Sequence, residues 1–436
     1  MHSRCPSRTC IETIYFVSFR TFYATNYFMT ITNRIAAVFS LFAAVLILGI
    51  GASMASTTAV IYSFAGDEDG EYADTDVAID LAGNLYGSTV LGGEIGGGTV
   101  WKLAPSGSSW VHTVLYSFSG GADGGEPYKG VTLDAAGNVY GTAVTGGAGS
   151  CEGGCGVAYE VTNSGGIWTQ SVIHAFTGGA DGSGPGARLA VDNRGNLYGM
   201  APTGGDFGLG TIYQLHPNGD GTYKFKLLHT FTGGLDGATG SAGKMVFNND
   251  HLYGAATTGG ANGQGTVFEL TPTARGEWDL KTLYSFKGEP DVGFPYGGLL
   301  FDQSGSIYGT SYYDGANDLG GVYQLTPKAD GNWKERVLYS FKSGSDGNSS
   351  ISNLVFDAAG NLYGTTSEGG LGPGTIFKLA RGTGAAWTES LPHSFSGPPD
   401  GAFPYSGMVG DKAGSFYGAT VHGGAADEGA IYKFTP

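Results

Sequence analysis

Residues 359–379 read AGNLYGTTSEGGLGPGTIFKL, and close variants of this stretch recur along the chain. The Tyr-Gly pair within it marks the copies, because it returns at intervals of 54 to 58 residues. The tyrosines of these pairs are Tyr86, Tyr140, Tyr198, Tyr253, Tyr308, Tyr363 and Tyr417. Seven copies of one unit indicate an architecture built from seven similar structural modules.

Each copy contains four short apolar runs, of which residues 354–357, 361–366 and 374–379 are the first three in the sixth copy. Residues 333–341, WKERVLYSF, represent the fourth run in the preceding copy. The runs are rich in β-branched and aromatic residues and are bounded by Gly, Asp, Asn or Pro, which is typical of strands. Four antiparallel strands repeated radially predict an all-β fold, a seven-bladed β-propeller.

The two ends of the repeat region are incomplete in complementary ways. Residues 57–64, TTAVIYSF, form a fourth-type strand without the three that precede it, and residues 430–436, AIYKFTP, form a third-type strand without a fourth. We therefore expect the N-terminal strand to complete the last blade and to remove the open sheet edges.

Two repeated features have a structural interpretation. Gly87 and its six equivalents follow the marker tyrosine, and we interpret them as allowing close approach to a neighbouring blade. A Tyr or His recurs in the fourth strand, at Tyr62, Tyr116, His174, His229, Tyr284, Tyr339 and His393. Because three histidines share this position with four tyrosines, we interpret these side chains as packing or hydrogen-bonding residues.

The N-terminal segment differs from the repeats. Residues 35–50, IAAVFSLFAAVLILGI, follow Arg34 and precede the small residues Ser53 and Ala55. This pattern predicts a secretory signal over residues 1–55, cleaved after Ala55, and a secreted or periplasmic propeller over residues 56–436. Met29 is a candidate for the true start. The alternative is a single membrane anchor, although 16 apolar residues are fewer than the roughly 20 of a typical span.

The net charge of the chain restricts the classes of partner that it can bind. Without residues 1–55 the chain has 18 basic and 37 acidic residues, a net charge of −19. Such a surface repels phosphate backbones and anionic lipids, so we expect neither nucleic acid nor, after signal cleavage, a membrane as partner. We expect a monomer without a cofactor.

The only cysteines beyond residue 55 are Cys151 and Cys155, in the sequence CEGGC. In an exported protein this spacing favours a local disulfide. The alternative is a metal site, which would need two further ligands, and none stands nearby in the sequence.

The repeated sequence pattern GNLYGTT…GG…GTIFKL, linked by VLYSF…G…DG, resembles the GloVer tandem repeats of exported bacterial proteins. The resemblance covers residues 58–436. It implies an extracytoplasmic repeat protein and carries no established reaction.

Candidate functional residues lie in the loops after the second and fourth strands, which emerge on one face of a propeller. The second of these loops carries an aspartate in every copy, at Asp69, Asp123, Asp181, Asp236, Asp291, Asp346 and Asp400. A ring of carboxylates suits Ca²⁺ or cationic groups. The alternative is that each aspartate stabilises the turn of its own loop.

Three copies place a tyrosine after a proline in the same region, at Tyr128, Tyr296 and Tyr405. We expect these side chains near the entrance of the central channel, where a phenol ring could stack on a sugar and hydrogen-bond with it. The alternative is that each ring packs its loop onto the neighbouring blade.

A catalytic residue should interrupt the repeat, because one active site does not need seven copies. Asp314, Glu368 and His422 are such departures and could serve glycoside or uronate chemistry with paired carboxylates. No motif of a known catalytic class connects them.

Three functions remain open from the sequence. The first is a binding module for a glycan or a protein on the loop face. The second is a propeller hydrolase or lyase acting on polysaccharide, and the third is a structural protein of the cell envelope.

Overall fold

The computed structural model describes residues 56–240, 243–342, 344–382 and 386–436. The expected signal sequence, its cleavage after Ala55 and the start at Met29 lie outside the described residues. Within the described residues no helix is both long and apolar enough to span a membrane.

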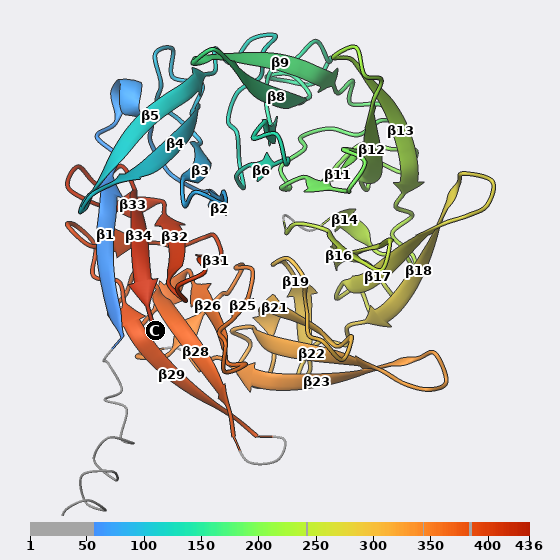
Figure 1. Cartoon of the computed structure of the whole chain (residues 1–436). Helices are drawn as coiled ribbons and strands as arrows, with labels where there is room; N and C mark the ends of the chain where they lie inside the picture. The colour runs from blue at the N-terminus through green and yellow to red at the C-terminus, as the bar shows by residue number, and fades with distance from the viewer. Residues whose placement is uncertain (1–55, 241–242, 343, 383–385) are drawn as a thin grey trace, which may run out of the picture. The chain divides into compact units, whose positions relative to one another are not determined.

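Seven antiparallel blades of four strands each surround a common centre, which confirms the predicted seven-bladed propeller, and in two of the blades a short loop strand joins the sheet as a fifth (Figure 1). The innermost strands are β2 (Ala78–Ile79), β6 (Thr132–Leu133), β10 (Ala190–Val191), β15 (Val246–Asn248), β20 (Leu300–Phe301), β25 (Val355–Phe356) and β31 (Val409–Gly410). The second strands are β3 (Leu85–Thr89), β7 (Val139–Ala143), β11 (Leu197–Ala201), β16 (His251–Thr258), β21 (Ile307–Asp314), β26 (Leu362–Thr366) and β32 (Phe416–Thr420).

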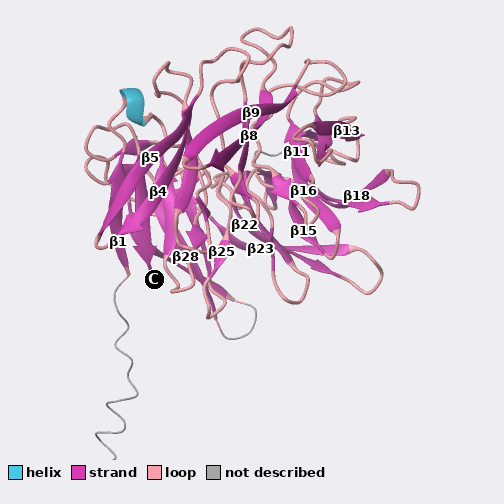
Figure 2. Ribbon diagram, turned by 45° about the horizontal axis from the view of Figure 1, so that its top comes forward, coloured by secondary structure: helices cyan, strands magenta, loops and turns pink. Residues whose placement is uncertain are grey.

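The two outer strands of each blade are longer. The third strands are β4 (Thr99–Ser106), β8 (Val157–Ser164), β12 (Thr211–Pro217), β17 (Thr266–Pro272), β22 (Gly321–Pro327), β28 (Thr375–Arg381) and β34 (Ala430–Thr435). The fourth strands are β5 (Ser109–Ser117), β9 (Ile167–Ala175), β13 (Tyr223–Thr230), β18 (Trp278–Ser285), β23 (Trp333–Ser340), β29 (Trp387–Ser394) and, for the last blade, β1 (Thr57–Ser63). Figure 2 shows these strands with loops on both sides of the ring.

The ring closes as the sequence predicted. Strand β1 pairs antiparallel with β34, from Thr57 opposite Thr435 to Ser63 opposite Ala430, and the last blade has the order β1-β34-β32-β31. The N-terminal strand therefore supplies the fourth strand of a blade whose other strands come from the C-terminal end.

A glycine opposite an aromatic residue forms the centre of every blade. The cross-strand pairs are Gly87–Trp101, Gly141–Tyr159, Gly199–Tyr213, Gly254–Phe268, Gly309–Tyr323, Gly364–Phe377 and Gly418–Tyr432. A Cβ at any of these glycines would overlap the ring of its partner. The sequence interpretation was wrong on this point: the close approach is to the aromatic ring of the adjacent strand, not to a neighbouring blade.

The loops on the candidate face are themselves paired. The loop after the fourth strand meets the loop after the second strand through β14 (Ala238–Gly240) on β16, β19 (Val292–Pro295) on β21, β24 (Gly347–Asn348) on β27 (Glu368–Gly369), and β30 (Gly401–Ala402) on β33 (His422–Gly423). The first three blades make this contact through single bridges, and η1 (Asp67–Asp69) is a short 3₁₀ turn in the first of these loops. The face is therefore a rigid support for side chains.

Candidate functional site

A cavity of about 570 Å³ lies at the loop face and is lined by residues from several blades. Tyr128, Tyr296 and Tyr405 all line it, together with Tyr312, which belongs to the second strand of the fifth blade. Residues Asp74, Lys129, Met200 and Ile351 are also part of the wall. We call this space the mouth cavity. The three tyrosines that the sequence singled out separately are thus brought together.

The tyrosine rings form an amphipathic wall. Tyr296 and Tyr312 have ring centroids 6.0 Å apart, and Tyr405 lies beside Phe403 at 6.2 Å. Burial raises the pKa of Tyr128, Tyr312 and Tyr405, and nearby acidic groups raise the pKa of Tyr128 and Tyr405 further. The phenols therefore remain protonated at neutral pH and can both donate and accept hydrogen bonds.

One ion pair stands in the wall of the mouth cavity. The Nζ of Lys129 lies 2.7 Å from Oδ1 of Asp74, and both side chains are largely buried. Burial opposes the charge on Lys129, but Asp74 and Asp76 outweigh it and raise the pKa of the lysine. The pair joins the first blade to the second and places charged oxygen and nitrogen atoms beside the aromatic rings.

A smaller cavity of about 390 Å³ adjoins the mouth cavity and shares Asp74, Tyr128 and Tyr405 with it. His422 and Glu126 line this side cavity. The His422 ring lies 5.0 Å from that of Tyr72 in an edge-on arrangement, and its Nδ1 is 3.2 Å from the carbonyl oxygen of Asp427. His422 is therefore the catalytic candidate that reaches a cavity.

The other two catalytic candidates lie elsewhere. Glu368 is exposed on β27, near enough to Tyr312 and Tyr405 to raise the pKa of both, but it lines neither cavity. Asp314 takes a backbone φ of 61°, where equivalent positions in other blades carry glycine. Burial and neighbouring acidic groups raise its pKa. The structure does not bring Asp314, Glu368 and His422 into one cavity.

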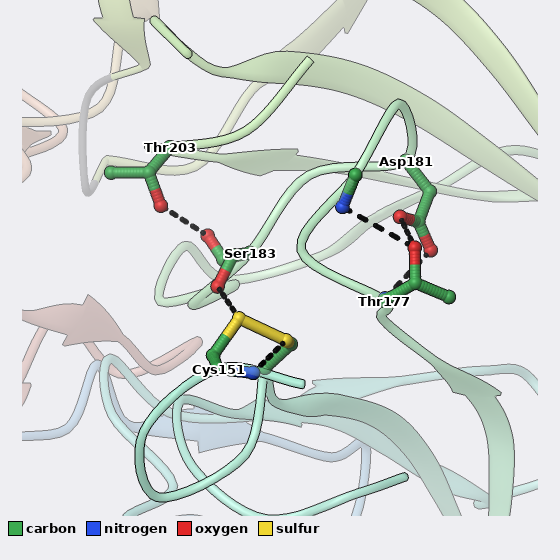
Figure 3. Close-up of a disulfide and its surroundings, with 7 residues drawn as sticks. Cys151, Thr177, Asp181, Ser183 and Thr203 are labelled. Atoms are coloured by element: carbon green, nitrogen blue, oxygen red, sulfur yellow. Dashed lines mark hydrogen bonds between the residues drawn. A yellow bond between two sulfur atoms is a disulfide. The ribbon is translucent and has the colours of Figure 1, made fainter. Parts of the chain in front are cut away.

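The seven loop aspartates have local partners. Each accepts a hydrogen bond from, or pairs with, the Tyr or His seven residues earlier, at distances of 2.5 to 3.2 Å. Asp181, for example, contacts Nε2 of His174 and accepts a hydrogen bond from the backbone N–H of Thr177. Figure 3 shows Thr177 beside Asp181. Within the described residues no group of His, Cys, Asp or Glu side chains is arranged to hold a metal ion. This geometry favours the turn interpretation over a Ca²⁺ ring.

Asp291 has a second acidic neighbour. Glu335 of β23 lies against it, and burial together with Asp291 raises the pKa of Glu335 to about 8. The protonated Glu335 can donate a hydrogen bond to Asp291, whereas the ionised form would place two negative charges together. The contact joins the outer strand of one blade to the loop of the preceding repeat.

This pair predicts a pH-dependent loss of stability. The folded pKa of Glu335 lies above its unfolded value of 4.5, so its contribution is complete below pH 4.5 and is lost as pH rises through 8. We expect Glu335→Gln, which mimics the protonated form, to raise the free energy of unfolding by about 1 kcal/mol at pH 8.5, after allowance for solvent screening. At pH 4.5 the variant and the parent should be equally stable.

Urea denaturation at both pH values measures this difference. Glu277→Gln removes the same charge at an exposed position and serves as control. A gain of the same size at both pH values would show that Glu335 is not protonated in the folded protein.

The structure contains a disulfide between Cys151 and Cys155, with a Cα–Cα distance of 5.0 Å (Figure 3). The Sγ of Cys151 lies 3.2 Å from Oγ of Ser183 in the next repeat, and Cys155 is fully buried. The bridge therefore closes the loop after β7, and the contact with Ser183 connects this loop to the next repeat.

Asp74, Lys129 and Glu126 were not predicted from the sequence, because they are neither repeated in every copy nor part of a recognisable motif. Alignment of the seven copies on the loop aspartate would have found one of them. Asp74 occupies the position of Tyr128, five residues after that aspartate. The mouth cavity is therefore lined by a repeat position whose residue differs between copies, rather than by residues that interrupt the repeat.

A sequence profile described as the Gloeobacter/Verrucomicrobia repeat matches residues 50–249, 111–287 and 241–436. No curated protein matches the chain. Among solved structures, a protein of unknown function from Dyadobacter fermentans DSM 18053 is similar over 88% of this chain and 99% of its own, with 11% identity and a TM-score of 0.44. A putative oxidoreductase (glucose dehydrogenase) from Thermus thermophilus is similar over 70% of this chain and 95% of its own, with 15% identity and a TM-score of 0.43.

Proposed function

The chain belongs to the Gloeobacter/Verrucomicrobia repeat family, and we propose that it is a secreted or periplasmic binding module whose mouth cavity holds a glycan. The observation that carries this proposal is the convergence of Tyr128, Tyr296, Tyr312 and Tyr405 on one cavity. These residues come from three blades that are distant in sequence, and the turns of the individual blades do not require them.

The wall of the mouth cavity has the chemistry that a sugar needs. A pyranose presents apolar C–H faces and a rim of hydroxyl groups, which suit aromatic rings with polar edges. Asp74 and Lys129 offer an acceptor and a donor beside those rings. A volume of about 570 Å³ lies within the range of small-molecule sites and would accommodate a short oligosaccharide.

The second candidate function is a polysaccharide hydrolase or lyase. His422 and Glu126 favour it, because both line the side cavity next to the proposed sugar site. Of the three candidates that the sequence offered, His422 lines that cavity, whereas Asp314 and Glu368 do not. In this function the mouth cavity would bind the same substrate.

Glycan binding by the purified protein comprising residues 56–436 tests the proposal. We expect retention on at least one immobilised cell-envelope or plant polysaccharide, followed by titration with its oligosaccharide. Tyr296→Ala and Tyr405→Ala should each weaken the affinity about tenfold, which corresponds to roughly 1.4 kcal/mol of lost stacking and burial.

Phe207→Ala is the matched control, because Phe207 is an aromatic residue exposed at 61% on a loop of the same face and lines neither cavity. Equal affinity of the tyrosine variants and the parent would place the glycan elsewhere. Failure of the folded protein to retain any glycan would overturn the proposal and favour a structural role in the envelope. Slow conversion of the oligosaccharide would favour the enzyme instead.

A further inference from the structure

Asp74, Tyr128, Tyr296 and Tyr405 occupy one and the same position of the repeat, five residues after the loop aspartate. A second ring of residues lies two positions further along each repeat. Its members, aligned by strand pairing with the marker tyrosines, are Asp76, Gly130, Arg188, Lys244, Gly298, Asn353 and Gly407. All except Gly130 line a cavity of about 140 Å³. We call this space the ring cavity. No two neighbouring blades carry the same residue at this position.

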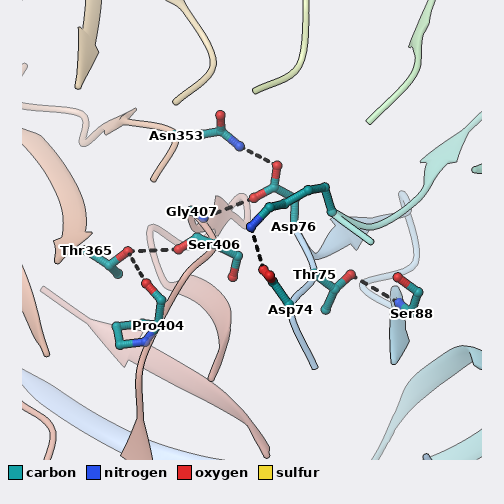
Figure 4. Close-up of polar contacts among 10 residues, drawn as sticks. Asp74, Thr75, Asp76, Ser88, Asn353, Thr365, Pro404, Ser406 and Gly407 are labelled. Carbon is teal, nitrogen blue, oxygen red and sulfur yellow. Dashed lines mark hydrogen bonds and ion pairs between the residues drawn. The ribbon is translucent and has the colours of Figure 1, made fainter. Parts of the chain in front are cut away.

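The single carboxylate of the ring is held by neutral donors. Oδ2 of Asp76 accepts a hydrogen bond from Nδ2 of Asn353 at 2.5 Å, and Oδ1 accepts one from the backbone N–H of Gly407 at 3.0 Å (Figure 4). The oxygen of the Asn353 amide accepts in turn from the backbone N–H of Gly298 at 2.5 Å. These contacts, all from uncharged groups, fix Asp76 on one side of the ring cavity.

The two cations of the ring stand in consecutive blades. Nε of Arg188 donates to Oγ1 of Thr132 at 3.3 Å, and among the described residues no carboxylate lies within 4.0 Å of either Arg188 or Lys244. Burial lowers the pKa of both side chains, and Arg188 contributes to the lowering at Lys244, to about 7. The two positive charges are therefore close enough to oppose each other.

The charges around the ring cavity do not balance. Lys129 is paired with Asp74 in the mouth cavity, and Asp76 is the carboxylate that raises the pKa of Arg188 and Lys244 against the effect of burial. When Lys244 is protonated, which its pKa of about 7 allows below neutral pH, one positive charge of the ring is uncompensated, in a protein whose overall formal charge is −16. Buried charges are costly unless they are paired, so an anion in this place would stabilise the ring.

We propose that the ring cavity binds a small tetrahedral oxyanion, of the size of phosphate or sulfate, between Arg188 and Lys244. The guanidinium group offers a planar fork to two oxygens, and the ammonium group offers a point charge to a third. Gly298 and Gly407 allow Asn353 to lie close to the backbone on the side of Asp76, since a Cβ at either position would overlap Asn353. The overall negative charge of the protein would repel larger polyanions, and the cavity of about 140 Å³ has room only for a small one.

Titration with inorganic phosphate, sulfate and acetate at constant ionic strength tests this site. We expect phosphate and sulfate, but not acetate, to raise the melting temperature in proportion to the logarithm of concentration, as ligand binding to the folded state requires. Lys244→Met and Arg188→Gln should each weaken phosphate binding at least tenfold in isothermal titration. Lys334→Met removes the same charge at an exposed position of β23 and should bind as the parent does.

A measurement on the unaltered protein covers the case in which a variant does not fold. Crystals soaked in selenate should show an anomalous selenium peak between Arg188 and Lys244. Selenate peaks only at other positions, a stronger effect of acetate, or unchanged phosphate affinity in folded Lys244→Met would overturn the proposal. These readouts are independent of glycan binding, so either site can fail without the other.

Discussion

A protein that lacks residues 56–64 is expected to lose at least about 5 kcal/mol of its free energy of unfolding and to associate through the exposed edge of β34. The deletion removes β1 and the fully buried Phe64, which packs against Trp101 with ring centroids 5.8 Å apart. Loss of a buried phenylalanine side chain alone costs about 3–5 kcal/mol. The backbone hydrogen bonds between β1 and β34 add to this cost.

Urea denaturation and size-exclusion chromatography measure the two effects. Phe64→Ala retains the strand and should show most of the stability loss without the association, because β34 remains paired. Ala59→Thr changes an exposed residue of the same strand and should leave both properties unchanged. If the deleted protein stayed monomeric and equally stable, the ring would not depend on its N-terminal strand.

Gly309→Ala is expected to destabilise the fifth blade by about 3 kcal/mol, although the substitution adds a single methyl group. A Cβ at this position would lie 2.5 Å from Cζ of Tyr323, a side chain that is fully buried and has no free space to move into. Overpacking of a core in this way typically costs about 1–3 kcal/mol, and the upper end applies because the ring sits directly opposite.

Gly179→Ala is the matched control, since its added Cβ would meet only Oγ1 of Thr177 at 3.4 Å. Combining Gly309→Ala with Tyr323→Leu should recover part of the loss, and a double-mutant cycle measures the coupling between the two positions. Additive effects of the two substitutions would mean that the glycine is needed for another reason.

Within the repeat, the residues that stabilise each blade and the residues that line the proposed sites occupy different positions. The glycine, the aromatic residue opposite it, the loop aspartate and its Tyr or His partner recur because every blade needs them for its own packing. Positions that point to the centre of the ring contribute little to a blade and can differ between copies. Asp76, Arg188, Lys244 and Asn353 differ for this reason, and so do Asp74 and Tyr128.

The repeat period, the strand order, the seven blades and the exchange of β1 into the last blade could be predicted from the sequence. Each depends on interactions within one repeat or between strands that follow a regular pattern, and such patterns are visible in alternating apolar runs and turn residues. The role of Gly309 was misjudged because a sequence pattern does not show which ring lies opposite a given glycine.

Only the tertiary structure decided which side chains meet at the centre. Asn353 and Asp76 are 277 residues apart and form a hydrogen bond because closure of the ring brings the first and sixth blades together. Tyr128 and Tyr405 share the mouth cavity for the same reason, whereas Asp314, Glu368 and His422 do not share one. Strand pairing is determined by residues that are close in the sequence. The set of side chains that lines a central cavity depends instead on how all seven blades are arranged around the ring.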